Sequence, residues 1–125
     1  MAGKKAKKPD SITLKIGELI LDKKGYDINI LDVQKLTNLT DYLIVCTSDS
    51  APQTKAIVEH IEEELKKKGI RPLHIEGKDH LDWVLLDYIN IVVNIFNKDM
   101  REFYNIERLW SDAIITPVKP KSKKQ

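Results

Sequence analysis

The stretch EGKDHLDWVLLDYINIVVNIFNKDMREFYNIERLW, residues 76–110, joins two strand-like apolar runs to a segment rich in aromatic residues. The two runs, residues 83–86 and 91–96, consist mainly of β-branched, aromatic and leucine side chains. Residues 87–90 between them begin with aspartate and end with asparagine, two residue types that are common in turns. This part of the stretch therefore predicts a β-hairpin.

A helix is expected directly after the hairpin. Asp99, followed three residues later by Glu102, matches the capping box that starts many helices. Phe103, Ile106 and Trp110 then recur at spacings of three and four, which place them on one helical face. We expect this helix to pack against the hairpin. Nothing in the stretch forms a recognisable set of catalytic residues.

The chain before residue 40 predicts one helix and one strand. Asp10 follows a proline and is a suitable N-cap for a helix that Gly25 ends. Residues 27–33 alternate in the manner of a β-strand. The apolar stripe of the helix consists of Ile12, Ile16, Leu19 and Ile20.

The middle of the chain predicts a strand, a helix and a second strand. Residues 42–47 form a continuous apolar run, which is typical of a central strand covered on both faces. Ser50 and Gln53 match a capping box for a helix that ends near Gly69, and residues 71–76 favour a short strand. These elements should form a right-handed crossover onto a parallel neighbour. The expected fold class is α/β (α+β), with a single mixed sheet of about five strands packed with about three helices.

Composition indicates one compact domain. The chain has 125 residues, of which 42% are hydrophobic, so it can bury one core of useful size. No apolar run approaches the roughly 20 residues that span a bilayer, and we expect no contact with a membrane. The single cysteine, Cys46, excludes an internal disulfide and fits a reducing compartment, so we expect a cytoplasmic protein.

The lysines are concentrated at the two ends of the chain. Residues 1–9 and 117–125 carry eight lysines and no acidic residue, so we expect a basic disordered N-terminal tail and a basic C-terminal tail. The domain between them, residues 10–116, has 13 basic and 19 acidic residues and thus a net charge of −6. A domain with a net negative charge suits a basic protein partner better than RNA. The tails are either solubilising ends or an RNA tether.

The residue types that carry catalysis or bind metals are sparse. His60, His74 and His80 do not stand at metal-ligand spacing with one another or with Cys46, so we predict no metal site. Cys46 lies in the expected central strand and should belong to the core. Residues 48–50 precede a helix and could hold an anion, but the glycines of a phosphate loop are missing, which favours simple capping. We predict no catalytic residue and no cofactor.

Five blocks of the sequence carry a family resemblance. They are TDYLIVCTS at residues 40–48, EG at 76–77, DWVLLDY at 82–88, VVNIF at 92–96 and FYNIERLW at 103–110. In order and spacing these blocks resemble the ribosomal silencing factors of the RsfS/Iojap family, over roughly residues 11–115. The resemblance implies a sheet with nucleotidyltransferase-like topology. It also implies a homodimer, and a protein that docks on the large ribosomal subunit at ribosomal protein L14 (uL14) and blocks joining with the small subunit.

The resemblance implies that the tryptophan-led strand faces the ribosomal partner. The matching positions are Trp83, Val84, Leu85, Leu86, Asp87 and Tyr88. Because strand side chains alternate, either Trp83, Leu85 and Asp87 or Val84, Leu86 and Tyr88 should point outward. The sequence leaves both arrangements open. It also leaves open whether Trp83 is an exposed interface anchor or an ordinary core aromatic.

Two positions depart from the family's pattern. Ile89 and Asn90 stand where the family usually has glycine and aspartate, and Asn94 stands where a histidine is common. A β-branched residue adopts a positive φ only at a cost, so we expect Asn90 to take that conformation and to shift the register of the hairpin. Asn94 can still form hydrogen bonds but cannot titrate.

The leading hypothesis is a translation repressor, with secondary contacts from the lysine tails to ribosomal RNA. One alternative is a nucleotidyltransferase-like enzyme that binds metal through Asp41, Asp82 and Asp87. It is disfavoured because no Gly-Ser pair precedes an Asp-x-Asp motif. The other alternative is a general RNA-binding module acting through the tails, which the acidic middle of the chain disfavours.

Overall fold

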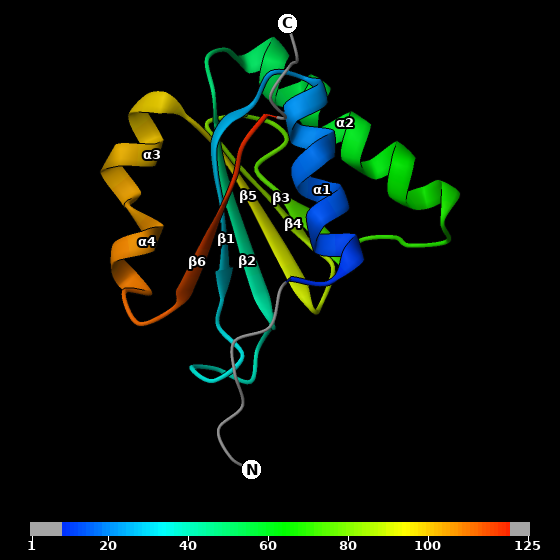
Figure 1. Ribbon diagram of the computed structural model, residues 1–125. Coiled ribbons are helices and arrows are strands. Elements are labelled where there is room, and N and C mark those ends of the chain that lie inside the picture. Colours follow the sequence, from blue (N-terminus) through cyan, green and yellow to red (C-terminus); the bar gives the residue numbers. More distant parts are fainter. Residues whose placement is uncertain (1–8, 121–125) are drawn as a thin grey trace, which may run out of the picture.

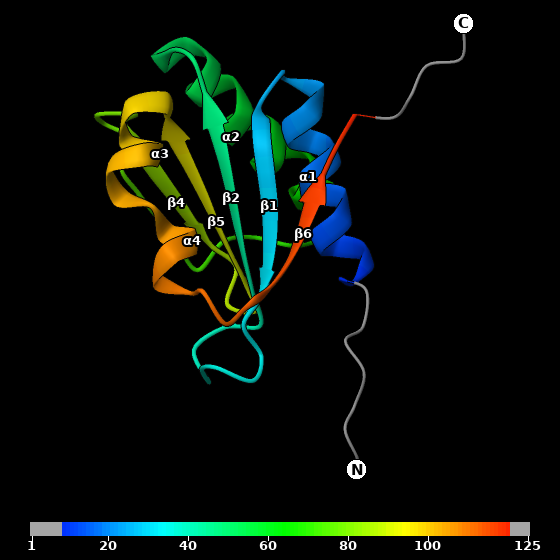
Figure 2. The same ribbon diagram turned by 60° about the vertical axis from the view of Figure 1, so that its left-hand side comes forward.

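The computed structural model describes residues 9–120 and contains one mixed β-sheet with helices on both faces (Figure 1). The elements are α1 (Ser11–Asp22), β1 (Tyr26–Asp32), β2 (Tyr42–Ser48), α2 (Ala51–Lys67), β3 (His74–Glu76), β4 (Trp83–Asp87), β5 (Ile91–Asn97), α3 (Lys98–Tyr104), α4 (Ile106–Leu109) and β6 (Ile114–Val118). The strand order is β3-β4-β5-β2-β1-β6. Helices α1 and α2 cover one face, and α3 with the short α4 lies on the other (Figure 2). The expected α+β class is confirmed.

Both long helices begin at the residues that the sequence indicated. The Asp10 side chain accepts a hydrogen bond from the Thr13 amide at 2.9 Å, and the Ser50 hydroxyl accepts one from the Gln53 amide at 3.2 Å. Each cap satisfies a backbone N–H that has no partner inside its helix. The apolar stripes of α1 and α2 then pack against the sheet and form the larger of two hydrophobic clusters.

Strand β2 is the centre of the sheet. All seven of its residues are buried, because helices cover both of its faces. It pairs with β1 in antiparallel and with β5 in parallel orientation. The expected crossover onto a parallel neighbour is therefore wrong, since β3 lies at the sheet edge with β4 and β5 between it and β2. The long apolar strand β5 fills the buried place beside β2, and the three-residue β3 stays at the rim.

A sixth strand was not expected from the sequence. Strand β6 pairs with β1 in antiparallel orientation, and Pro117 lies opposite Asn29. Proline disfavours an interior strand but is tolerated at a sheet edge, where β6 lies. The domain boundary expected after Thr116 therefore falls inside this strand. Residues 1–8 and 121–125, and with them most of the expected tails, lie outside the described residues.

The β4–β5 hairpin is confirmed, but its turn differs from the expectation. Ile89, not Asn90, has a positive φ of 75°. The Asn90 amide donates to the Tyr88 carbonyl at 2.9 Å, which closes a γ-turn centred on Ile89. The Asn90 carbonyl accepts from the amides of Asp41 and Tyr42, so its backbone is fixed against the start of β2. The conformational strain falls on Ile89 instead.

The helix after the hairpin starts earlier than expected and is broken. Asn97, not Asp99, is the N-cap, and its side chain accepts from the Met100 amide at 2.9 Å. Asn105 then adopts the left-handed conformation with φ 43°, which ends α3 and redirects the chain into α4. Because of this break Phe103 is 73% exposed, although it was expected on the buried face. Met100 packs on the smaller cluster, which covers the second face of the sheet.

Candidate partner-binding surface

The six residues implied by the family resemblance divide between the two faces of the sheet. Val84 and Leu86 are fully buried beneath α1 and α2. Trp83, Leu85 and Asp87 are half-buried on the opposite face, where α3 and α4 lie. Tyr88 follows the strand and packs against the first cluster. Of the two arrangements that strand alternation allowed, the structure has the one in which Trp83, Leu85 and Asp87 face away from the main core.

Trp83 is held rigidly rather than displayed freely. Its indole Nε1 donates to the Asn94 side-chain oxygen at 3.0 Å. The centroid of its ring lies 4.9 Å from that of Phe96 and 4.6 Å from that of Tyr104. Such aromatic pairs add stability beyond the area that they bury. Trp83 therefore belongs to the second cluster and contributes only part of its surface to the exterior.

Gly77 fixes the place where β4 begins. It has a φ of 88°, and a Cβ atom built on it would lie 2.0 Å from the Trp83 carbonyl oxygen. Only glycine permits this conformation together with so close an approach. The EG block of the sequence thus has a physical cause, which spacing alone did not reveal.

An open groove lies on the part of the sheet that α3 and α4 leave uncovered. Strand pairing places His74, Asp87, Val92 and Leu43 in one row across β3, β4, β5 and β2. Leu85 lies beside this row. With residues of the β1–β2 loop and Trp110, these side chains enclose about 370 Å³, and we call the hollow the β3–β4 groove. The floor is apolar and the β3 side is polar.

The polar side of the groove is an imidazole between two carboxylates. His74 Nε2 lies 2.9 Å from Glu76 Oε2, and His74 Nδ1 lies 3.6 Å from Asp87 Oδ2. The Asp87 Oδ1 atom also accepts from the Ile89 amide at 2.8 Å. His74 was expected to be a structural histidine, hydrogen-bonded or exposed, and it is both.

The rest of the groove comes from segments that the sequence patterns did not connect with β4. Thr37, Leu39 and Thr40 belong to the loop between β1 and β2, and Trp110 follows α4. Leu39 is 85% exposed, whereas Thr40 is 8% exposed. In the ribbon view this loop and the β4–β5 turn project from the same end of the sheet (Figure 1). Leu39, an apolar residue in a mostly polar loop, was the sequence feature that could have indicated that this loop contributes to a binding surface.

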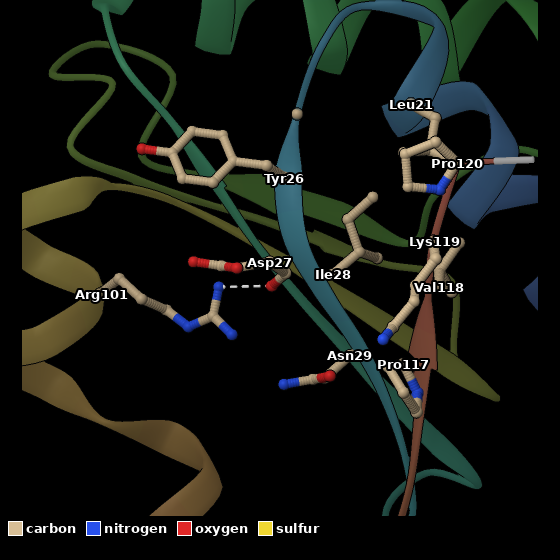
Figure 3. Close-up of a pocket in the computed structure, with 11 residues that line it drawn as sticks. Leu21, Tyr26, Asp27, Ile28, Asn29, Arg101, Pro117, Val118, Lys119 and Pro120 are labelled. Carbon is tan, nitrogen blue, oxygen red and sulfur yellow. Dashed lines mark hydrogen bonds between the residues drawn. The ribbon is translucent and has the colours of Figure 1, made fainter. Parts of the chain in front are cut away.

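A second hollow, of about 390 Å³, lies beside β1 and β6 (Figure 3). Arg101 points into it, but its guanidinium donates to the Asp27 carbonyl and to the Thr47 hydroxyl, each at 2.7 Å. The same group forms an ion pair with Glu107. These bonds tie α3 and α4 to β1 and β2, so Arg101 is engaged in holding the fold together.

The residues considered for catalysis are dispersed or engaged. Within residues 9–120 no group of three or more His, Cys, Asp or Glu side chains is arranged to hold a metal ion, and this includes Asp41 and Asp82. Cys46 is fully buried, and burial raises the pKa of its thiol to about 12. The Ser48 hydroxyl bonds to Thr54, while Ser50 caps α2. None of the helices in this part of the chain has the length and apolarity to cross a membrane.

These features define a class: a small α+β protein whose distinctive surface is an open, acid-edged sheet face. A family model described as "Ribosomal silencing factor during starvation" matches residues 6–125. The chain therefore belongs to the ribosomal silencing factor family.

Relatives in sequence and in structure agree with this assignment. The Ribosomal silencing factor RsfS of Bacillus subtilis is 39% identical over 92 residues, which are 74% of this chain and 78% of that protein. A mouse protein named Mitochondrial assembly of ribosomal large subunit protein 1 is 28% identical over 96 residues, 74% of this chain and 42% of that protein. A crystal structure of a Chromobacterium violaceum protein is 36% identical and superposes with a TM-score of 0.78, covering 88% of each chain.

Proposed function

We propose that this protein is a translation repressor of the cytoplasm that binds the large ribosomal subunit at uL14 and sterically prevents joining with the small subunit. The family and the names of its members support a role on the ribosome. The name of the mouse relative points to the large subunit. The mechanism is occlusion, which needs a binding surface and no chemical turnover.

The observation that carries the proposal is the β3–β4 groove. It combines an apolar floor with carboxylates at the rim, on a domain with a net charge of −6. Ribosomal proteins are mostly basic, so sign and surface chemistry are complementary. Leu85, in the middle of the half-buried set Trp83, Leu85 and Asp87, offers the apolar contact that forms the centre of such an interface.

The lysine tails would add a second contact. Once the domain is docked, the eight lysines outside residues 10–116 lie close to ribosomal RNA and contribute salt-dependent affinity without sequence preference. The same β4 face also suits a self-contact, as in the homodimer that the resemblance implied. The oligomeric state should therefore be measured together with binding to the subunit.

Subunit association tests the proposal directly. Purified large and small subunits are mixed with the protein, and whole ribosomes are scored on a sucrose gradient. The wild type should reduce their formation in proportion to the fraction of large subunits bound. Leu85→Arg should lose this effect, because it places a positive charge against a basic partner. Unchanged association at saturating wild-type protein would refute the proposal.

A matched control separates a local effect from a general one. Leu14→Arg makes the same substitution at a partly exposed position of α1, on the opposite face of the sheet. This variant should repress like the wild type. Thermal unfolding of both variants then shows whether Leu85→Arg remains folded.

A further inference from the structure

We propose that three exposed aliphatic side chains at one end of the sheet, Leu39, Leu73 and Ile89, form a second contact with uL14 beside the β3–β4 groove. We call these three residues the loop-end patch. The inference rests on the proposed docking and adds residues that the family resemblance did not implicate. Backbone strain at Ile89, the exposure of all three side chains and their continuity with the groove support it.

The fold itself gives no reason for an isoleucine at position 89. Its φ of 75° is unfavourable for a β-branched residue, and its side chain is 57% exposed, so packing does not offset the strain. The turn is held by other groups. The Tyr88 amide donates to the Ile91 carbonyl at 2.8 Å, and the Asp87 carboxylate accepts from the amide of residue 89 at the same distance. A glycine would keep both bonds. Strain that the fold does not require is typical of functional sites, which indicates that the isoleucine side chain serves a contact outside the domain.

The loop-end patch comes from three connecting segments that are bonded to one another. The Asp41 amide, at the end of the β1–β2 loop, donates to the Asn90 carbonyl at 3.0 Å. The Leu73 amide donates to the Asp87 carbonyl at 2.7 Å, so Leu73 lies beside the end of β4, where the hairpin turn begins. The β1–β2 loop and this turn project from the same end of the sheet (Figure 1). The patch is therefore displayed from a held backbone.

An exposed aliphatic patch on a held backbone suits a protein partner. Leu39 and Leu73 are 85% and 66% exposed, and the Leu39 amide donates to the Thr37 hydroxyl at 3.1 Å, which fixes the loop locally. Groups that are already held lose little conformational freedom on binding. Covering them removes apolar surface from water, which is favourable. The phosphates of RNA offer no apolar surface of this kind, so the patch fits a protein.

Continuity with the β3–β4 groove identifies that protein. Leu39 lines the groove directly. The amides of Leu73 and Ile89 both donate to Asp87, which is another lining residue, one to its carbonyl and one to its carboxylate. The groove and the patch thus form one continuous surface. A protein seated on the groove also covers the patch, and the occupant proposed for the groove is uL14.

The test measures two properties of each full-length variant: its affinity for purified uL14 and its free energy of unfolding. Ile89→Gly should raise the free energy of unfolding, because it removes strain, and should raise the dissociation constant about fivefold, because it removes an apolar contact. A residue that acts only through the fold would not move stability up and affinity down. Leu39→Ser and Leu73→Ser should weaken binding by a similar factor, with little change in stability.

Lys24→Gly is the matched control for strain. Lys24 also has a positive φ, 69°, and an exposed side chain. It precedes β1, whose first residue pairs with Thr47 near the end of β2, whereas the patch lies at the start of β2. The variant should therefore gain stability, as Ile89→Gly does, and leave the affinity for uL14 nearly unchanged.

The remaining outcomes decide against the inference in distinguishable ways. If Ile89→Gly binds uL14 like the wild type while Leu85→Arg abolishes binding, docking at the groove stands and the patch is excluded. If Ile89→Gly weakens self-association in analytical ultracentrifugation but not binding to uL14, the patch belongs to a contact between two copies and the inference is wrong. If the wild type does not bind uL14, the proposed function fails, and this contact fails with it.

Discussion

Among single residues, Gly77 and Gly69 differ in one respect that can be measured. Both have a positive φ, 88° and 78°, but a Cβ at Gly77 meets the Trp83 backbone, whereas the space around Gly69 is open. Gly69→Ala should therefore cost only the conformational penalty, about 1 kcal/mol. Gly77→Ala should cost more than about 3 kcal/mol, because the start of β4 must move. Urea denaturation checks both values, and equal costs would contradict the close approach.

Replacing Ile89 should have the opposite effect on stability, a gain rather than a loss. A β-branched residue with φ of 75° is strained by roughly 1–3 kcal/mol, and the side chain is 57% exposed. Ile89→Gly should remove this strain and raise the free energy of unfolding by about 1 kcal/mol, after the entropic cost of glycine. Asn90→Gly is the control, since Asn90 has no positive φ to relieve and should be destabilised. Chemical denaturation of the two variants would decide between strain and ordinary turn flexibility.

Among the helices and strands, α3 and α4 are held onto the sheet by the network of Arg101. Burial raises the pKa of the Glu107 carboxyl, but hydrogen bonds from Arg101 and Asn29 outweigh burial, so the pKa lies below its ordinary value. A lowered folded pKa stabilises the fold above the pKa of the unfolded carboxyl, about 4.3. This contribution is lost as the pH falls through the folded pKa. At a pH below the folded pKa of Glu107, the wild type should lose this stabilisation entirely.

Replacing Arg101 tests this network. Arg101→Met should reduce the free energy of unfolding by about 2 kcal/mol at pH 7, because it leaves a largely buried carboxylate without its charged partner. The variant should also lose less stability than the wild type on acidification, since the pKa of Glu107 is no longer depressed. Lys67→Met is the control: its pair with Glu64 is exposed on α2, and no measurable change is expected. Measuring the free energy of unfolding of the wild type, Arg101→Met and Lys67→Met over the same acidic pH range would test these expectations.

Most elements that local patterns specify were predictable, although the start of α3 and the turn at Ile89 were not, and those that depend on distant pairing were missed. Asp10 and Ser50 cap their helices because the relevant hydrogen bonds span only three residues. Strand β6 and the place of β3 depend on which strand lies beside β1 and β2, which no local pattern encodes. The candidate site shows the same division. Alternation gave the two possible faces of β4, but Thr40 and Trp110 reach the groove only through the tertiary fold.

At the scale of the whole molecule, the basic tails and the acidic domain carry opposite charges. These charges should affect binding to isolated uL14 and binding to whole large subunits in different directions. Replacing the seven lysines within residues 1–8 and 121–125 by glutamine changes the net charge from +2 to −5. Binding to isolated, basic uL14 should then become equal or tighter, because repulsion from the tails is removed. Binding to whole large subunits should become weaker, and its dependence on salt shallower by about one unit of slope for each RNA phosphate that is no longer neutralised. Sedimentation with subunits and titration of uL14, each over a salt series, measure the two effects. The same direction of change for both partners would contradict a division of labour between an acidic, protein-binding body and basic, RNA-binding ends.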